Sequence, residues 1–256
     1  MRWRLLLTPP GGGIDNMALD SALMERARVT GEGVVRVYSW SGPTLSLGRN
    51  QRARGFYSPA LARERAVCVV RRITGGRALL HHREITYSVT APASPEQSLR
   101  EAYSALNDAL LATLRRLGVL AHFATVTARS PSPSIAPCFH TPAAGELVFE
   151  GRKLAGSAQV REGGAMLQHG SILVHDDQPM LDALSSLPLG EIPPAATLSQ
   201  ALPLAPTPGI FAEALFGVVR ERWDQGAREL AAHDVPAPAL HSARVMYADD
   251  DWTWRR

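Results

Sequence analysis

The sequence predicts an α+β fold in which a mixed or antiparallel β-sheet is flanked by helices. Two groups of strand-like segments, rich in β-branched or alternating apolar residues, lie on either side of one long amphipathic helical pattern. Neither a repeat nor a change of composition divides the chain, so we expect residues 1–256 to form a single domain.

The first group begins with an apolar strand over residues 3–8, which the glycines at 11–13 end. Asp15 or Asn16 is expected to cap a helix that runs from Met17 to about Arg28. The elements expected next are a strand over 34–40, a short strand and polar turn over 43–51, a helix over 59–65 with proline at its start, and strands over 66–72 and 84–89.

The second group follows the longest helical pattern, over 98–117, which Gly118 ends. A loop rich in Ser and Pro is expected over 125–137. The elements expected after it are an antiparallel meander with strands over 146–150, 153–160, 165–168 and 170–174, short helical pieces over 176–209, a helix over 211–232, and a tail that contains Trp252 and Trp254.

Composition excludes several classes of protein. The chain is 45% hydrophobic and 20% charged, as ordinary globular proteins are, and its net charge of +3 gives no reason to expect nucleic-acid binding. It has no apolar run of the ~18 residues that a membrane span needs and no signal peptide. The two cysteines form no disulfide framework, so a cytoplasmic protein with reduced thiols is expected.

A cysteine and a lysine lie on either side of one predicted strand and turn. Cys138 is on a loop, and Lys153 follows the hairpin turn at 150–152. A loop that folds back over the strand would bring the two together, and a cation beside a thiol favours the nucleophilic thiolate. From the residues alone, an unreactive loop thiol explains Cys138 equally well. Cys68, among valines, is interpreted as a small buried hydrophobe.

A second candidate element is the turn Arg71-Arg72-Ile73-Thr74-Gly75-Gly76-Arg77-Ala78. Its arginines supply forked donors, and its glycines expose backbone N–H groups, which suits an anion or a carbonyl group. A solvated turn between two core strands is the alternative interpretation. His81, His82, His140 and His169 lack the spacing of zinc ligands, so no metal site is expected. His169 is expected to line or brace a pocket.

Several motifs together resemble those of the biotin/lipoate A/B protein ligase family (the BPL/LPL catalytic domain). The segment 71–88 resembles the family's arginine–glycine signature, and Gly-Arg-Lys-Leu-Ala-Gly-Ser-Ala-Gln over 151–159 is similar to its lysine motif. The segments 16–20 and 43–51 match as well, in the expected order. The resemblance covers about residues 14–225. It implies a lipoate-ligase-like catalytic domain with no C-terminal accessory domain.

Within this family, Pro137-Cys138-Phe139 ahead of Glu146-Leu147-Val148 resembles the octanoyltransferases of Gram-positive bacteria. The resemblance implies an acyltransferase of lipoate biosynthesis that takes an octanoyl group from acyl carrier protein onto Cys138 as a thioester. The group then passes to a lysine of a lipoyl-carrier protein, such as the glycine cleavage H protein or an E2 subunit. No cofactor is implied.

The resemblance also implies the site. Cys138 and Lys153 are the expected catalytic residues. The residues expected to bind substrate are Arg72, Gly75, Gly76, Arg77, Ala78, His81, Gly156, Ser157, Ala158 and His169. Apolar strands around Leu79, Ile85 and Leu173 are expected to wall a tunnel for the acyl tail. His82 departs from the family, which commonly has Asp there, and the segment 139–145 departs from the subfamily.

Two other functions fit the same motifs. An ATP-dependent lipoate-protein ligase would work through lipoyl-adenylate, would need ATP and lipoate, and would not need Cys138. A non-catalytic homologue that binds an acyl group or a cofactor would explain the altered loop around Cys138. For the transferase, a rim of arginines (Arg49, Arg52 and Arg54) is expected to steer acidic carrier proteins to the site.

Overall fold

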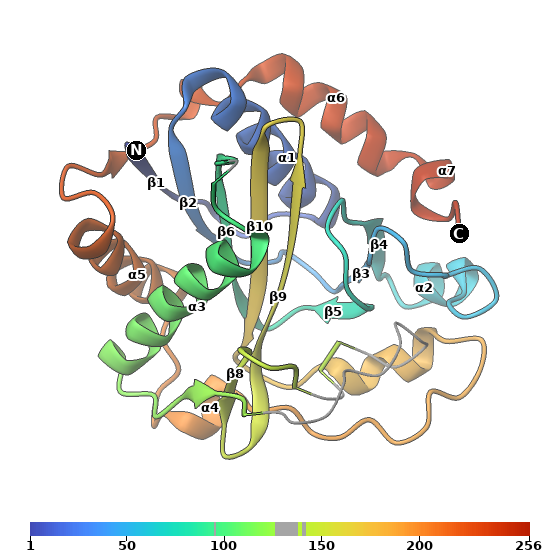
Figure 1. Cartoon of the computed structure of the whole chain (residues 1–256). Coiled ribbons are helices and arrows are strands. Elements are labelled where there is room, and N and C mark those ends of the chain that lie inside the picture. Colours follow the sequence, from blue (N-terminus) through green and yellow to red (C-terminus); the bar gives the residue numbers. More distant parts are fainter. Residues whose placement is uncertain (95, 126–137, 140–141) are drawn as a thin grey trace.

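The computed structural model describes residues 1–94, 96–125, 138–139 and 142–256 (Figure 1). Residues 126–137 of the predicted loop and His140 lie outside this part of the chain. Within it, the helices and strands form the α+β arrangement that the sequence predicts.

The centre of the molecule is an eight-stranded mixed sheet, counted over the described residues, with the order β11-β1-β2-β6-β10-β9-β8-β7. Its strands are β1 (Trp3–Leu7), β2 (Gly33–Tyr38), β6 (Glu84–Pro92), β7 (His122–Phe123), β8 (Leu147–Phe149), β9 (Arg152–Glu162), β10 (Ala165–Leu173) and β11 (Arg228–Glu229). The pairs that β1 forms with β11 and β2 are parallel, and the other pairs are antiparallel.

A second sheet lies beside the first. It contains β4 (Cys68–Arg71), β3 (Thr44–Leu47) and β5 (Leu79–His81) in the order β4-β3-β5. The sequence predicts no bounds for β5, although an apolar strand is expected around Leu79. Its three residues are too few for a periodic pattern, and they are extended because they pair with β3. This small sheet places the loop between β4 and β5 next to β9 and β10.

Helices cover both faces of the large sheet. On one face α3 (Leu99–Arg116) and α5 (Pro208–Arg222) pack against each other and enclose the main core, which includes Leu5, Val35 and Leu110. On the other face α1 (Gly13–Thr30) packs against β6 and β10 and is itself covered by α6 (Ala237–Ala248). The shorter helices are α2 (Pro59–Glu64), η1 (Gln178–Leu184), α4 (Leu198–Ala201), η2 (Ala232–Asp234) and α7 (Asp250–Thr253).

Helix α3 shows how local chemistry sets an element. Ser98 caps it, and Glu101 completes a capping box with the Ser98 backbone, so the helix begins where the sequence predicts. Leu106, Leu110 and Leu114 are buried on one face. The chain leaves the helix at Gly118, whose φ of +87° favours glycine.

Four predictions about elements are wrong. Helix α1 begins at Gly13, because the Asn16 side chain donates to the carbonyls of Gly11 and Ser39 instead of capping. The strands predicted at 165–168 and 170–174 are one strand, β10, since β6 and β9 pair with it throughout. The helix predicted over 211–232 spans 208–222, and the predicted tail contains α6 and α7.

No helix of the described chain is both long and apolar enough to cross a membrane.

Candidate active site

Lys153 and Cys138 meet as the sequence predicts. β8 and β9 are joined by a two-residue turn, Glu150-Gly151, in which both residues have positive φ, as in the tight turns that suit hairpins. The turn directs Lys153 inward, where it is 3% exposed. Its Nζ lies 3.6 Å from the Cys138 Sγ and donates to the Cys138 carbonyl oxygen at 2.9 Å.

A carboxylate completes this cluster. Lys153 Nζ also donates to Glu146 Oε1 at 2.8 Å. Burial by itself lowers the pKa of Lys153, but Cys138 and the Glu146 carboxylate outweigh it, so the pKa of Lys153 is raised above its ordinary value. The lysine is therefore held as a cation beside the sulfur. Glu146 is not among the predicted site residues, because its side chain meets Lys153 only through the pairing of β8 with β9.

The segment that carries Cys138 is tied to the arginine–glycine turn. The Cys138 N–H donates to the Ala78 carbonyl oxygen at 3.0 Å. The next side chain, Phe139, is buried against Leu79 and Leu173, with its ring centroid 5.2 Å from Lys153 Nζ. Ala78 thus holds the cysteine in place through its backbone and is itself fully buried.

Arg72 is buried inside the turn. Its guanidinium donates to the Ser46 carbonyl and hydroxyl oxygens, both at 2.9 Å, to the Gly75 carbonyl, and to the Arg77 carbonyl at 2.7 Å. Burial lowers the pKa of Arg72 to about 10, and Cys138 acts in the opposite direction. Gly75 and Arg77 therefore shape the turn through their carbonyl groups.

Arg71 does not join Arg72 in the site. Successive side chains of a strand point to opposite faces, so Arg71 is directed away from the turn. It donates to the carbonyl oxygens of Thr253, Gly48 and Gln51 at 2.7 to 2.8 Å. The interpretation of the two arginines as one anion-binding pair is wrong in this respect, and only Arg72 lines the pocket.

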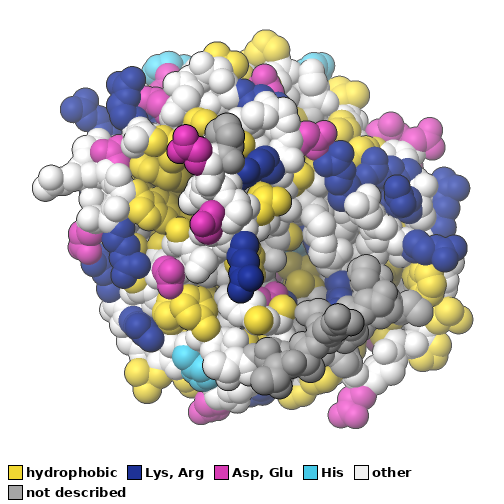
Figure 2. Space-filling model, in the orientation of Figure 1, with side chains coloured by type: hydrophobic (Ala, Val, Ile, Leu, Met, Phe, Trp, Pro, Cys, Tyr) yellow, Lys and Arg dark blue, Asp and Glu magenta, His cyan; other side chains and the backbone are white. Residues whose placement is uncertain are grey.

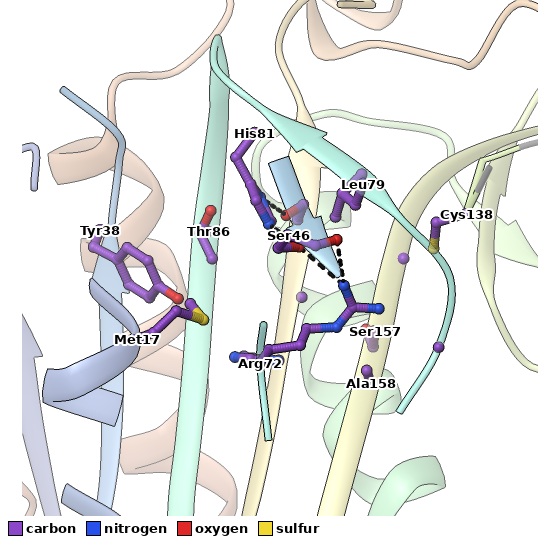
Figure 3. A pocket seen from close by; sticks show the side chains of 15 residues that line it. Met17, Tyr38, Ser46, Arg72, Leu79, His81, Thr86, Cys138, Ser157 and Ala158 are labelled. Carbon is purple, nitrogen blue, oxygen red and sulfur yellow. Dashed lines mark hydrogen bonds between the residues drawn. The ribbon is translucent and has the colours of Figure 1, made fainter. Parts of the chain in front are cut away.

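A pocket extends from Cys138 into the molecule, and Figure 3 shows its labelled side chains. Cys138 lies at one end, Met17 and Tyr38 lie at the opposite end, and Arg72 and Ser46 lie between them. The empty space between its lining atoms amounts to about 410 Å³ with the solvent at its mouth included. The lining residues are Met17, Tyr38, Ser46, Arg72, Gly76, Leu79, His81, Thr86, Cys138, Gly156, Ser157, Ala158, His169, Gly170 and Ser171.

The two histidines of the pocket wall are each held by a carboxylate. His81 Nδ1 lies 2.7 Å from Glu84 Oε1, and its Nε2 lies 2.8 Å from the Ser46 hydroxyl. His169 lies 2.7 Å from the Thr74 hydroxyl and 3.3 Å from Asp20. Burial lowers the pKa of His169, although Asp20 opposes the shift. His169 lines the pocket, and the bracing role stays a prediction.

The structure places most of the predicted binding residues in this wall, and their roles stay predictions. Three of them do not line the pocket and lie in the turn between β4 and β5: Gly75, Arg77 and Ala78. The strands around Leu79, Ile85 and Leu173 all contribute to the pocket wall, but of these three side chains only Leu79 lines it. Ile85 belongs to the main core, and Leu173 packs against Phe139. His82 does not line it either, and its Nδ1 lies 3.4 Å from Asp177.

Several residues that line the pocket are not among those predicted from the sequence. Met17 belongs to a matched motif but reads as a core position of its helix. Ser46 and Thr86 alternate with apolar neighbours on their strands, which was the available signal. Gly170 marks a close approach of backbones, because a Cβ there would lie 2.6 Å from the Ser157 hydroxyl. No cluster of three or more metal-ligating side chains is found in the described part of the chain.

Comparison with known proteins identifies relatives of this chain. Residues 13–202 match the model of the lipoyl protein ligase A/B catalytic domain. Octanoyltransferase LipM of Kyrpidia tusciae is 44% identical over 195 residues, which cover 73% of this chain and 71% of that protein. Octanoyltransferase LipM of Moorella thermoacetica is 36% identical over an alignment of 270 positions, which covers 99% of this chain and 98% of that protein.

Solved structures share the fold. A bi-partite lipoate protein ligase from Thermoplasma acidophilum has a TM-score of 0.78 and 20% identity, with 99% of this chain and 96% of that chain covered. A lipoate-protein ligase A bound with ATP has a TM-score of 0.76 and 20% identity, with 99% of each chain covered.

Proposed function

The chain belongs to the lipoyl protein ligase A/B catalytic domain family, and we propose that within it the chain is an octanoyltransferase of lipoate biosynthesis that carries its acyl group on Cys138. One observation supports this most: the Cys138 Sγ lies at the end of a pocket and 3.6 Å from a buried lysine ammonium. A cation at this distance favours the thiolate, which is the nucleophilic form.

The first half-reaction loads the enzyme. The Cys138 thiolate attacks the thioester carbonyl of octanoyl-acyl carrier protein, a new C–S bond forms, and the carrier leaves as its thiolate. Lys153 lies where negative charge develops on the carbonyl oxygen, and a preorganised charge at such a point stabilises the transition state. The octanoyl tail occupies the pocket past Leu79 toward Met17.

The second half-reaction transfers the group. The amine of a lysine on a lipoyl-carrier protein, the glycine cleavage H protein or an E2 lipoyl domain, attacks the Cys138 thioester. A C–N bond forms, the C–S bond breaks with its electron pair on sulfur, and the amine loses a proton to solvent. The chemistry needs a reduced thiol, so we place it in the cytoplasm.

The test is acylation without ATP. Incubation with octanoyl-acyl carrier protein is expected to add one octanoyl mass to the protein, and hydroxylamine is expected to remove it. The adduct should be absent in Cys138→Ala and present in Cys68→Ala, since the Cys68 thiol is half-buried and burial raises its pKa. Product that requires ATP and lipoate and survives Cys138→Ala would instead identify a ligase.

A further inference from the structure

Glu146 occupies a position at the catalytic cluster that the mechanism above does not use. Its side chain is buried, and both carboxylate oxygens have partners. Oε1 accepts from Lys153 Nζ and Oε2 accepts from the Ala143 N–H, each at 2.8 Å. Its backbone carbonyl accepts from the Ala124 N–H at 2.8 Å. The carboxylate is therefore fixed between the lysine and the segment that follows Cys138.

The charge of the cluster changes when the sulfur is acylated. When the Cys138 sulfur is a thiolate, as the attack on the donor requires, Lys153 faces two anions, this thiolate and the Glu146 carboxylate. In the acyl-enzyme the sulfur is a neutral thioester, and Glu146 is the remaining carboxylate within reach of Lys153 among the described residues. A buried ammonium without a counter-ion tends to lose its proton. Glu146 thus matters more after acylation than before it.

The inference rests on the proposed acyl-enzyme. We propose that Glu146 is a positioning residue for the second half-reaction, because it keeps Lys153 protonated and beside Cys138 while the sulfur carries the acyl group. Lys153 can then stabilise the oxyanion that forms when the acceptor amine attacks, and afterwards the departing Cys138 thiolate. Without Glu146, the thiolate of the free enzyme still holds the lysine, so loading is affected less than transfer.

Other ionisable groups that face the cluster do not replace Glu146. Tyr103, on α3, is near enough to Glu146 and Cys138 that both raise its pKa, after burial, to about 12, so its phenol stays neutral near pH 8. Arg72 adds positive charge near Cys138, and a second positive charge nearby disfavours protonation of Lys153. Cys138 and Glu146 are the groups that raise the pKa of Lys153.

The experiment separates the two half-reactions. Wild type and Glu146→Gln are loaded with octanoyl-acyl carrier protein, freed of donor, and mixed with a lipoyl domain, and the loss of the acyl-enzyme is followed by intact mass between pH 6 and pH 9. We expect Glu146→Gln to load within a few-fold of wild type and to accumulate the acyl-enzyme. Its transfer should be roughly 100-fold slower at pH 8, the typical effect of losing one oxyanion donor.

The pH dependence distinguishes positioning from simple structural damage. In Glu146→Gln, burial lowers the pKa of Lys153 in the acyl-enzyme, and the protonated lysine is the active form. The ratio of wild-type to variant transfer rates should therefore grow as pH rises and shrink as pH falls. Glu146→Asp, which keeps the charge on a shorter side chain, should show a smaller ratio with the same trend.

Glu150→Gln is the matched control, because Glu150 is an exposed carboxylate on the same hairpin, and we expect wild-type rates. Equal, pH-independent slowing of both half-reactions in Glu146→Gln, or no slowing of transfer, would overturn the inference. If Glu146→Gln fails to fold, the trend in Glu146→Asp decides in the same way. A wild-type protein that forms no acyl-enzyme contradicts the proposed function instead.

Discussion

Lys153 is almost inaccessible to solvent, so its charge depends on its neighbours. A buried ammonium is tolerated when a carboxylate and a carbonyl replace its water, and Glu146 and Cys138 provide them here. The same ion pair that keeps Lys153 charged also stabilises the buried Glu146 carboxylate. Removal of Lys153 leaves Glu146 as a buried carboxylate that has lost its cation.

This dependence leads to a prediction about stability and activity together. Lys153→Met should lower the free energy of unfolding by about 3 kcal/mol, because Glu146 is left unpaired. It should also reduce acyl transfer by about 10²–10³-fold. The double variant Lys153→Met/Glu146→Gln should recover most of the stability and none of the activity. Urea unfolding and single-turnover transfer measure the two effects, and a double variant no more stable than Lys153→Met would contradict the pairing.

At the scale of elements, a buried carboxylate joins the first strand to the first helix. Glu32, in the turn between α1 and β2, accepts from Arg4 of β1 at 2.8 and 3.0 Å and from Arg26 of α1 at 2.6 Å. Hydrogen bonds from these two guanidinium groups lower the pKa of Glu32 to about 2. The turn therefore fixes how β1 meets β2 at the Gly33 end of β2, the opposite end of this strand from Tyr38 in the pocket wall.

Glu32→Gln should lower the free energy of unfolding by about 2 kcal/mol at pH 7, since charge-assisted hydrogen bonds are lost. A carboxyl whose pKa is lower in the folded state stabilises the protein above its unfolded value, here about 4.5, and loses this contribution as pH falls toward about 2. The difference between wild type and variant should shrink over this acid range. Denaturation at several pH values tests it. Glu25→Gln, in an exposed pair with Arg28, should cost much less at every pH.

At the scale of the whole molecule, the C-terminal segment extends the predicted arginine rim. The Arg256 carbonyl accepts from the Ala53 and Arg54 N–H groups, and the Arg255 guanidinium donates to the Arg49 carbonyl. Arg52, Arg54, Arg255 and Arg256 are exposed, and Figure 2 shows Lys and Arg side chains gathered on this side of the molecule. Arg49 is paired with Glu162, which lies at the opposite end of β9 from Lys153.

This basic surface should affect encounter with acidic carriers more than chemistry. Arg52→Glu/Arg54→Glu should raise the KM for octanoyl-acyl carrier protein several-fold and weaken its dependence on salt, with kcat little changed. Transfer from a small octanoyl thioester should stay at the wild-type rate. Arg115→Glu, the same substitution at one exposed arginine at the end of α3, is the control. Equal effects on the small and the carrier-bound donor would argue against steering.

Much of the fold follows from local features of the sequence. The Glu150-Gly151 turn, the Ser98 cap and the leucine spacing of α3 each act within a few residues, so they predict their elements correctly. The same is true of the strands at 3–8, 34–40 and 84–89, whose ends are accurate to a few residues. The α+β class follows from the order of these elements.

The candidate site was predictable as far as its motifs reach. Cys138 and Lys153 could be paired from the sequence because one short strand and one tight turn separate Lys153 from the loop that carries Cys138. Local pattern could not predict Glu146 as the counter-ion, Met17 at the far end of the pocket, or the divergence of Arg71 from Arg72. Each of these depends on which strand pairs with which, and in what register.

The sequence by itself therefore determined the fold class, the family and the proximity of Cys138 to Lys153, since each is encoded in residue types at short spacing. Tertiary structure alone decided the pocket and its charges. Helices α6 and α7 lie in the segment predicted as a tail, and α6 packs on α1. The Lys153 ammonium is stabilised by Glu146, which the pairing of β8 with β9 brings to it. Burial and pairing are properties of contacts between segments distant along the chain, and no local propensity contains them.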